Sequence, residues 1–244
     1  MKEYRQIVSF SGGKDSTAML LMMLEKGIQI DEIIFLDTGV EFPQMYEHIK
    51  LVEKYINKKI TVLKNKKGLF EYWLLDHVKT KGKFKGQKGY SWADHRARWC
   101  TATLKVQVSN SYLKEKYKDY QVILYQGIAF DEQERATRES GSKIGSIIKY
   151  PLVEWEITEK EALEYCYSKG FTWNGLYEKF SRLSCFCCPL QSLKELRVLY
   201  KEFPELWNIM KIWDSKTYRK FRADYSIVEL EEKFKREGEK NKTI

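Results

Sequence analysis

The feature that most constrains the fold is a glycine-containing string between a strand-like run and a helical pattern. Residues 6–10 predict a short buried strand, and the pattern of residues 15–26 predicts the helix that follows. Between them lies Ser9-Phe10-Ser11-Gly12-Gly13-Lys14-Asp15-Ser16. The two glycines allow a tight turn, so that backbone amides can approach an anion, and the positive end of the helix dipole adds to the attraction. The string therefore predicts a phosphate-binding loop.

This loop supplies further donors besides its amides. Lys14 offers a full positive charge, and Ser11 and Ser16 offer hydroxyl groups. It differs from a Walker A loop, because Val8 stands where that motif has its first glycine and Asp15 stands where it has Ser or Thr. We therefore expect a phosphate cradle of another type.

Strand-like runs alternate with helical patterns through the first half of the chain. Nearly continuous apolar strands separated by helices are typical of a buried parallel sheet, and right-handed crossovers make such a sheet doubly wound. The second half is mostly helical, and its lysine-rich tail beyond Arg236 is expected to fray. The predicted strands are 6–10, 32–37, 60–63 and 122–126, and the predicted helices are 15–26, 43–57, 103–117, 158–169 with a capping box of Thr158 and Glu161, 193–213 with an interruption at Pro204, and 228–236.

These patterns suggest two regions in an α/β fold with a Rossmann-like, doubly wound parallel sheet. Residues 1–155 are expected to form a nucleotide-binding α/β domain, and residues 156–244 a helical region that carries a cysteine-rich motif. The composition agrees with a folded protein, because 43% of the residues are hydrophobic and 14% are aromatic, too many for a disordered chain.

Hydropathy argues against a membrane protein. The longest purely apolar run, residues 18–24, is far shorter than the about 20 residues of a membrane span, and the first residues show no apolar segment of a secretory signal. We therefore expect a cytoplasmic protein with no membrane partner.

The chain is basic, with 43 Lys and Arg residues against 34 Asp and Glu residues and a formal net charge of +9. Residues 79–92 hold five lysines and three glycines together with Phe84, Tyr90 and Trp92, and their polarity predicts a loop. Such a loop can contact the phosphate backbone of a nucleic acid or an anionic ligand. The alternative is a solvated, flexible loop.

Besides Cys166, the cysteines form two sequence-distant groups that are considered together: Cys185, Cys187 and Cys188 lie within four positions, and Cys100 lies far upstream of them. In a reducing compartment, clustered cysteines more often bind a metal or take part in catalysis than form disulfides. The two groups are therefore consistent with a metal or iron–sulfur site. Cys166 lies in the middle of a predicted helix without a partner and is expected to pack.

Several strings together make the chain resemble a known group. The phosphate-loop string resembles that of the PP-loop ATP pyrophosphatases, which split ATP between the α and β phosphates and usually adenylate a substrate. The strings that resemble the phosphoadenosine phosphosulfate (PAPS) reductase family are Phe35–Pro43, Arg98–Cys100 with Lys105, Gly127 with Glu134 and Arg138, and Arg182 with Cys185–Pro189. The resemblance covers residues 5–190. It implies an adenine-nucleotide α-hydrolase-like fold, with the nucleotide over the carboxyl ends of the strands.

The resemblance also implies site residues. The residues expected to bind ATP are Ser9, Ser11, Gly12, Gly13, Lys14, Asp15, Ser16, Asp37, Thr38, Gly39 and Gly127, and those expected to act in catalysis are Lys14, Asp15, Asp37 and Arg138. Asp37 is expected either to hold ribose, adenine or Mg²⁺, or to cap the next helix. Arg135 and Arg138 are expected either to clamp a phosphate or sulfate, or to be exposed helical arginines.

A metal centre is implied by the same resemblance. Adenylylsulfate reductases of this family hold a [4Fe–4S] cluster with a Cys-Cys pair and a later C-x-x-C, but here Thr101 breaks the pair. Because the neighbours Cys187 and Cys188 do not easily point the same way, three ligands are favoured over four. Zinc with His95 as fourth ligand and buried thiols without metal remain alternatives. The positions that match are Cys100, Cys185 and Cys188, with Cys187 available as a fourth.

The departures from the family pattern separate two kinds of enzyme. The reductases have a degenerate phosphate loop and a nucleophilic cysteine near the C-terminus, whereas here the loop is intact and no cysteine follows Cys188. The combination resembles ATP-dependent sulfurtransferases, such as the DNA phosphorothioation enzymes and the cluster-containing tRNA thiolases.

The resemblance to the sulfurtransferases implies ATP with Mg²⁺, a [4Fe–4S] cluster or Zn²⁺, a nucleic-acid or small-molecule acceptor, and a sulfur-donor protein such as a cysteine desulfurase. A homodimer is compatible with it. The alternatives are a PAPS or adenylylsulfate reductase of sulfate assimilation and a nucleotide-regulated nucleic-acid-binding module that uses residues 79–88.

Overall fold

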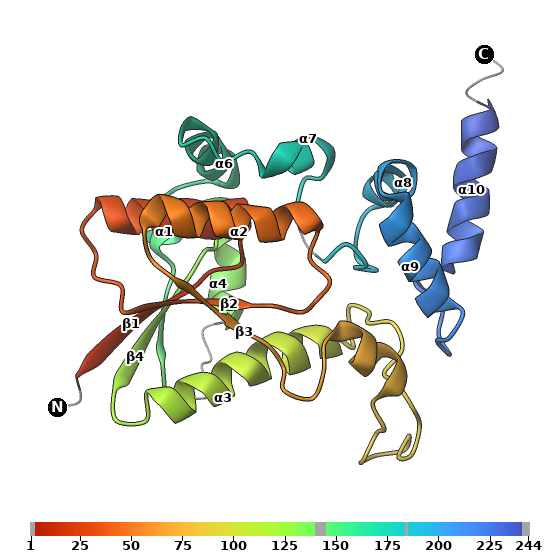
Figure 1. Ribbon diagram of the computed structural model, residues 1–244, viewed down its shortest axis with the longest axis horizontal. Coiled ribbons are helices and arrows are strands. Elements are labelled where there is room, and N and C mark those ends of the chain that lie inside the picture. The colour runs from red at the N-terminus through yellow and green to blue at the C-terminus, as the bar shows by residue number, and fades with distance from the viewer. Residues whose placement is uncertain (1–2, 140–144, 184, 241–244) are drawn as a thin grey trace. The chain divides into compact units, whose positions relative to one another are not determined.

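The computed structural model describes residues 3–139, 145–183 and 185–240 (Figure 1), and no helix within them is both long and apolar enough to cross a membrane. The chain divides into two compact units, the first made of residues 1–37, 42–64 and 105–183 and the second of residues 38–41, 65–104 and 184–244. These units interleave along the chain. The linear boundary after residue 155 that the sequence suggests for the domains stays a prediction.

The first unit is built on a five-stranded sheet with the strand order β3-β2-β1-β4-β5, in which every neighbouring pair is parallel. Because β1 is central and the chain moves first to one side of it and then to the other, the loop after β1 leaves the sheet at a topological switch point. The predicted doubly wound parallel α/β fold is therefore confirmed. The strands are β1 Tyr4–Ser9, β2 Glu32–Leu36, β3 Ile60–Leu63, β4 Gln121–Gln126 and β5 Ile147–Lys149.

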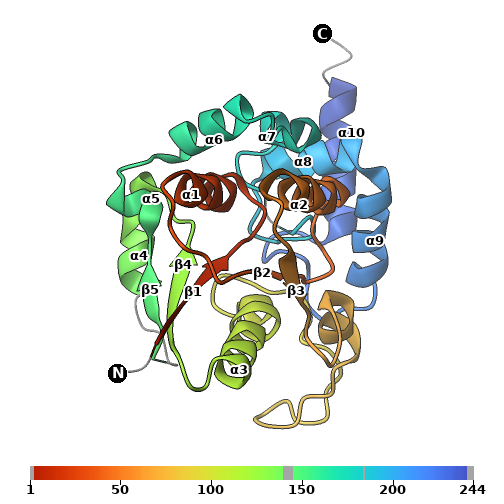
Figure 2. The same cartoon turned by 60° about the vertical axis from the view of Figure 1, so that its left-hand side comes forward.

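Helices cover both faces of this sheet. Figure 2 shows α1 (Lys14–Glu25) and α2 (Pro43–Ile56) on one face and α3 (Gln107–Lys116) on the other. Under α3 the core consists of buried Ile7, Ile34, Leu113, Tyr117, Val122 and Leu124. The other helices of this unit are α4 Gln133–Glu139, α5 Pro151–Glu154, α6 Glu159–Ser168, α7 Leu176–Lys179 and the 3₁₀ turns Phe130–Glu132 and Trp173–Gly175.

Local signals in the sequence set several of these helix ends. Gly27 follows α1 with a φ of 68°, the left-handed conformation that ends a helix. The capping box predicted for Thr158 and Glu161 is present with both of its hydrogen bonds. The helix predicted over residues 103–117 begins with wider π-helical turns over Thr101–Val106, which continue directly into α3.

The regular elements of the second unit are helices: a π-helical segment Tyr72–Asp76 and, among its described residues, the α-helices α8 Leu193–Glu202, α9 Pro204–Asp214 and α10 Ile227–Lys240. Pro204 starts a new helix, as the predicted interruption requires. The expectation that the tail beyond Arg236 frays is wrong as far as Lys240, where α10 ends, and residues 241–244 lie outside the described part of the structure. Ion pairs from Glu237 to Arg197 at 2.6 Å and to Lys233 at 3.1 Å support this last turn.

Candidate functional site

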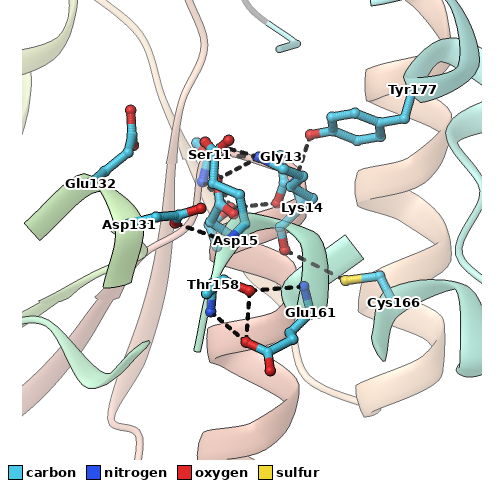
Figure 3. A network of polar contacts seen from close by, with 12 residues as sticks. Ser11, Gly13, Lys14, Asp15, Asp131, Glu132, Thr158, Glu161, Cys166 and Tyr177 are labelled. Atoms are coloured by element: carbon cyan, nitrogen blue, oxygen red, sulfur yellow. Dashed lines mark hydrogen bonds and ion pairs between the residues drawn. The ribbon is translucent and has the colours of Figure 1, made fainter. Parts of the chain in front are cut away.

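The phosphate loop lies between β1 and α1 in the first unit (Figure 3), and its backbone conformation favours glycine at Gly12. Its φ is +79°, and a Cβ there would lie 2.5 Å from the Met45 sulfur. The Trp173 indole N–H donates to the Gly12 carbonyl at 2.8 Å and fixes the turn. Gly13 is the N-cap residue of α1 and provides no side-chain cap. The free N–H groups at the start of this helix therefore need other acceptors.

The hydroxyl groups of the loop bond to each other and to its backbone. The Ser11 and Ser16 oxygens lie 2.9 Å apart, and the Ser16 hydroxyl donates to the Gly13 carbonyl at 3.0 Å. The Ser11 amide donates to the Ser16 oxygen at 3.2 Å. Both hydroxyl groups are thus gathered at the start of α1, where an anion can replace their mutual hydrogen bond.

Lys14 is nearly fully buried, and its ammonium is shared by two carboxylates. Its Nζ lies 3.3 Å from Asp15 Oδ2 and 3.1 Å from Glu159 Oε1. Its backbone amide donates to the Tyr177 hydroxyl at 2.7 Å. The pair of carboxylates holds the positive charge at the loop, where an incoming phosphate can compete for it.

Asp15, the residue after this lysine, has a partly buried carboxyl group with a shifted pKa. Burial raises the pKa of its carboxyl to about 6, Lys14 opposes the rise, and the charges of Glu159 and Glu132 add to it. One of its oxygens, Oδ1, is buried and has no hydrogen-bond partner among the residues that the structure describes. An oxygen in this state suits a cation, so Asp15 has the chemistry to hold Mg²⁺ beside the loop.

Gly127 follows β4 and is pressed against the start of α1. A Cβ at this position would lie 2.6 Å from Ser16 Cα, 2.7 Å from Ser16 N and 2.9 Å from the Asp15 carbonyl carbon. All three are backbone atoms, which cannot turn away as a side chain can. The glycine therefore has a packing reason, and its predicted contact with a nucleotide stays a prediction.

Asp37 follows β2, and its partners include Tyr46 and Lys64. It accepts a hydrogen bond from the Tyr46 hydroxyl at 2.8 Å and forms an ion pair with Lys64 at 3.1 Å. The N-cap of α2 is Phe42, whose side chain makes no capping hydrogen bond. The interpretation of Asp37 as a helix cap is therefore wrong, and its buried carboxylate lies at the carboxyl edge of the sheet, as does the phosphate loop.

In the second unit, the segment after Asp37 packs against the cysteine motif. The Thr38 hydroxyl donates to Glu41 Oε1 at 3.0 Å and lies 3.7 Å from the Cys185 sulfur. The Cys185 thiol in turn donates to the same Glu41 oxygen at 3.8 Å. Gly39 has a φ of +81°, and a Cβ there would lie 2.8 Å from Leu69. Thr38 therefore supports the cysteine motif directly and through Glu41, whereas Gly39 makes room for Leu69.

The loop that carries the cysteines is fixed by its backbone. The buried Gln191 amide donates to the carbonyls of Cys185 at 3.1 Å and Phe186 at 3.3 Å. The Arg222 guanidinium donates to the carbonyls of Pro189 at 3.2 Å and Gln191 at 2.7 Å. These bonds preset the conformation that presents the thiols.

The four clustered cysteines share one neighbourhood. Cys187 is fully buried, whereas Cys100, Cys185 and Cys188 are half-buried, and all are free thiols. Burial raises the pKa of Cys187 well above its usual value, and the charges of the other three cysteines and of Glu41 raise it further. Within the described part of the chain, no three His, Cys, Asp or Glu side chains are arranged to hold a metal ion.

The donor set fits a thiophilic metal in kind, because grouped thiolates are the ligands that zinc and iron–sulfur clusters prefer. The assignment of these cysteines as metal ligands stays a prediction, and so does the role of His95, whose side chain is exposed.

Among the described side chains, the predicted clamp of two arginines on α4 is not seen. Arg135 is exposed and pairs with Glu132 at 3.2 Å. Arg138 lies on α4, but its side chain is outside the described part of the structure. Cys166 is fully buried, donates to the Lys14 carbonyl at 3.4 Å and has its pKa raised by burial to about 12, so it packs as predicted.

Some contacts of these sites cannot be read from local sequence. Tyr177 and Trp173 hold the phosphate loop from far along the chain, and Gln191 and Arg222 hold the cysteine loop. Glu41 stands inside a string that the sequence singles out, which was the one available signal for its place beside Cys185.

Several known proteins are similar to the chain in sequence. Two uncharacterised proteins of Methanocaldococcus jannaschii are 31% identical over 208 residues and 30% identical over 210 residues. These matches cover 82% and 85% of this chain but 39% and 47% of the relatives, so the chain spans less than half their length. An uncharacterised 37.8 kDa protein of Escherichia phage 186 is 25% identical over 250 residues, covering 82% of this chain and 71% of that protein.

Two solved structures are similar in their backbone. A phosphoadenylyl-sulfate (PAPS) reductase from Candida auris in complex with phosphate has a TM-score of 0.47 at 17% identity, covering 76% of this chain and 82% of its own. The U34-tRNA thiolase of Methanococcus maripaludis with its [4Fe–4S] cluster has a TM-score of 0.46 at 15% identity, covering 97% and 73%.

The family follows from the sequence itself. Residues 5–191, which include the phosphate loop, the segment around Asp37 and the Cys185–Cys188 motif, match the phosphoadenosine phosphosulfate reductase domain as one continuous region. This region is more than half of the chain. The chain therefore belongs to the phosphoadenosine phosphosulfate reductase domain family.

Proposed function

We propose that this chain is an ATP-dependent adenylating enzyme that takes part in sulfur transfer to a nucleic-acid or small-molecule acceptor. The observation that carries the proposal is the intact phosphate loop, in which a nearly buried lysine, two hydroxyl groups and the start of a helix converge. Membership of the phosphoadenosine phosphosulfate reductase domain family supports a nucleotide and sulfur chemistry.

In this proposal the β and γ phosphates of ATP lie on the loop. Gly12 and Gly13 let the backbone approach them, Ser16 donates a hydroxyl and Lys14 turns from its carboxylates toward the phosphates. An acceptor oxygen attacks the α phosphorus, the α–β bond breaks, and pyrophosphate leaves with the bond electrons. The preorganised donors stabilise the charge that develops on the leaving group. Mg²⁺ held by Asp15 would neutralise phosphate charge when bound.

The cysteine group supplies the sulfur half of the proposal. A sulfur nucleophile displaces AMP from the adenylated acceptor, so that the new bond is to sulfur and the oxygen leaves with AMP. Cys100, Cys185 and Cys188 are the half-buried thiols that would hold a [4Fe–4S] cluster or Zn²⁺, with the buried Cys187 as a further donor. A cysteine desulfurase is a suitable class of sulfur donor, together with a thiol reductant that supplies the two electrons needed to release its persulfide sulfur as sulfide.

Two other functions remain as alternatives with distinct products. A sulfonucleotide reductase would release sulfite from PAPS or adenylylsulfate, and a nucleotide-regulated nucleic-acid-binding module would bind without turnover. The intact loop favours ATP cleavage over both.

The test is pyrophosphate release from ATP by anaerobically purified protein with candidate acceptors. Replacing Lys14 by Met keeps the length of the side chain and removes its charge, and we expect a loss of about 100- to 1,000-fold in rate, the usual effect of removing one donor to a developing anion. Lys26→Met at the other end of α1 is the matched control and should retain the rate. Thermal unfolding of both variants checks their folding. Absence of pyrophosphate release, or equal rates in the two variants, would overturn the proposal.

A further inference from the structure

Residues 77–90 of the second unit form a loop whose backbone is tied across its base. Val78 and Lys88 form an antiparallel bridge, the Lys79 amide donates to the Gln87 carbonyl at 3.0 Å, and the Gly86 amide donates to the Lys79 carbonyl at 2.8 Å. Figure 2 shows this segment as an extended yellow loop. The lysines between these backbone contacts therefore lie on a loop of defined conformation.

One lysine of the loop is held within the second unit. The Lys79 ammonium lies 5.1 Å from the ring centre of Phe84 and 4.9 Å from that of Tyr218, and it donates to the Tyr218 hydroxyl at 2.8 Å. The Arg219 guanidinium also donates to the Tyr90 carbonyl at 2.9 Å. These contacts join the loop to the segment after α9, so that Tyr218 and Phe84 belong to one surface.

The other cations of this surface face solvent. Residues 79–98 contain seven Lys and Arg residues and one acidic residue, Asp94, so that this segment carries +6 of the chain's +9. Asp94 is already paired with Arg219 at 3.3 Å. Within residues 79–98, six exposed cations form no ion pair with any described residue, namely Lys81, Lys83, Lys85, Lys88, Arg96 and Arg98. We call these six residues with Phe84 and Tyr218 the basic surface.

Aromatic rings lie among these charges. Phe84 is 58% exposed and Tyr218 is 50% exposed, so each presents a large aromatic ring to solvent. A ring face beside lysines offers a stacking platform for a base whose phosphate the lysines contact. In a duplex the bases are stacked inside and cannot reach such a ring.

We propose that the basic surface binds single-stranded nucleic acid. This inference rests on the proposed function in one respect, since it makes a nucleic acid the acceptor. The binding itself needs no ATP.

The experiment measures fluorescence anisotropy of a labelled single-stranded RNA of about 16 nucleotides, a DNA strand of the same sequence and the matching duplex, without ATP. The test variant is Lys81→Gln with Lys83→Gln and Lys85→Gln. The control is Lys54→Gln with Lys59→Gln and Lys160→Gln, three exposed lysines of the first unit that make the same change in net charge.

Loss of three phosphate contacts on a single strand should make the plot of log affinity against log salt less steep by about 2. The affinity should fall by roughly 50-fold at about 0.15 M salt. The control variant should bind like the wild type. Phe84→Leu should weaken binding by roughly 5- to 150-fold while leaving the salt slope unchanged, because it removes stacking and no charge.

Equal losses in the two triple variants, unchanged binding in the test variant, or duplex bound as tightly as the single strands would overturn the proposal. Pyrophosphate release by the same preparations keeps the two proposals apart. Nucleic-acid binding without pyrophosphate release would refute only the adenylating enzyme, and release without binding would refute only the nucleic-acid surface.

Discussion

Replacing Gly127 by Ala tests whether the start of α1 must stay where the phosphate loop needs it. The added Cβ would lie 2.6 Å from Ser16 Cα, whereas ordinary contact begins at 3.4 Å, so the two backbones must separate by about 0.8 Å. Overpacking of this kind costs about 1–3 kcal/mol in the free energy of unfolding. A displacement of about 1 Å at a reacting group can also cost about 100-fold in rate.

Two measurements separate these effects. Urea denaturation gives the free energy of unfolding, and pyrophosphate release at saturating ATP gives the rate per folded molecule, for which we expect a fall of roughly 10- to 100-fold. Gly238→Ala is the matched control, since Gly238 lies in α10 with nothing within 4 Å of its added Cβ. Its free energy of unfolding should rise by about 0.5–1 kcal/mol, as expected for alanine in a helix.

The result that refutes the reasoning is equally specific. If Gly127→Ala unfolds at the same urea concentration as the wild type, the overlap is absent in solution. If it is destabilised but each folded molecule releases pyrophosphate at the wild-type rate, the start of α1 does not position the phosphates.

Two further predictions concern ionisable groups. Burial raises the pKa of Asp15 from 3.8 to about 6, so its contribution to the free energy of unfolding falls as pH rises from about 4 to 6. Urea denaturation at pH 4 and pH 7 measures this fall, which should be smaller in Asp15→Asn than in the wild type by at most about 3 kcal/mol. Equal pH profiles of the two proteins would contradict the prediction. Burial also raises the pKa of Cys166 to about 12 and that of Cys187 well above its usual value. Iodoacetamide should therefore label only Cys100, Cys185 and Cys188 in the native metal-free protein, and mass spectrometry showing label on Cys166 would refute this.

The sequence predicts the elements that local physics specifies. A buried run that ends in glycines marks β1 and the loop, and a capping box marks the start of α6, because each signal lies within a few residues of the structure it produces. It misses β5, since three half-exposed residues carry no pattern that separates them from a loop.

The missing parts of the site are long-range contacts. Tyr177 reaches the Lys14 amide from 163 residues away, and Cys185 reaches Glu41 from 144 residues away. No periodicity or spacing records such a pair, because the fold alone brings its members together. Asp37 shows the same limit, since its position predicts a cap as readily as a ligand, and the structure decides against the cap because Phe42 is the N-cap of α2.

The charges around the loop explain why the proposed function includes a divalent cation. Lys14 is balanced by Asp15 and Glu159 in the absence of nucleotide, so a triphosphate would enter beside two carboxylates with one cation among them. Glu159 and Glu132 already raise the pKa of Asp15, and phosphate charge would act in the same direction. Asp15 must then either take up a proton or share its unpartnered oxygen with a cation. Mg²⁺ prefers carboxylate oxygens and would offset the added phosphate charge, so the proposal assigns that oxygen to Mg²⁺.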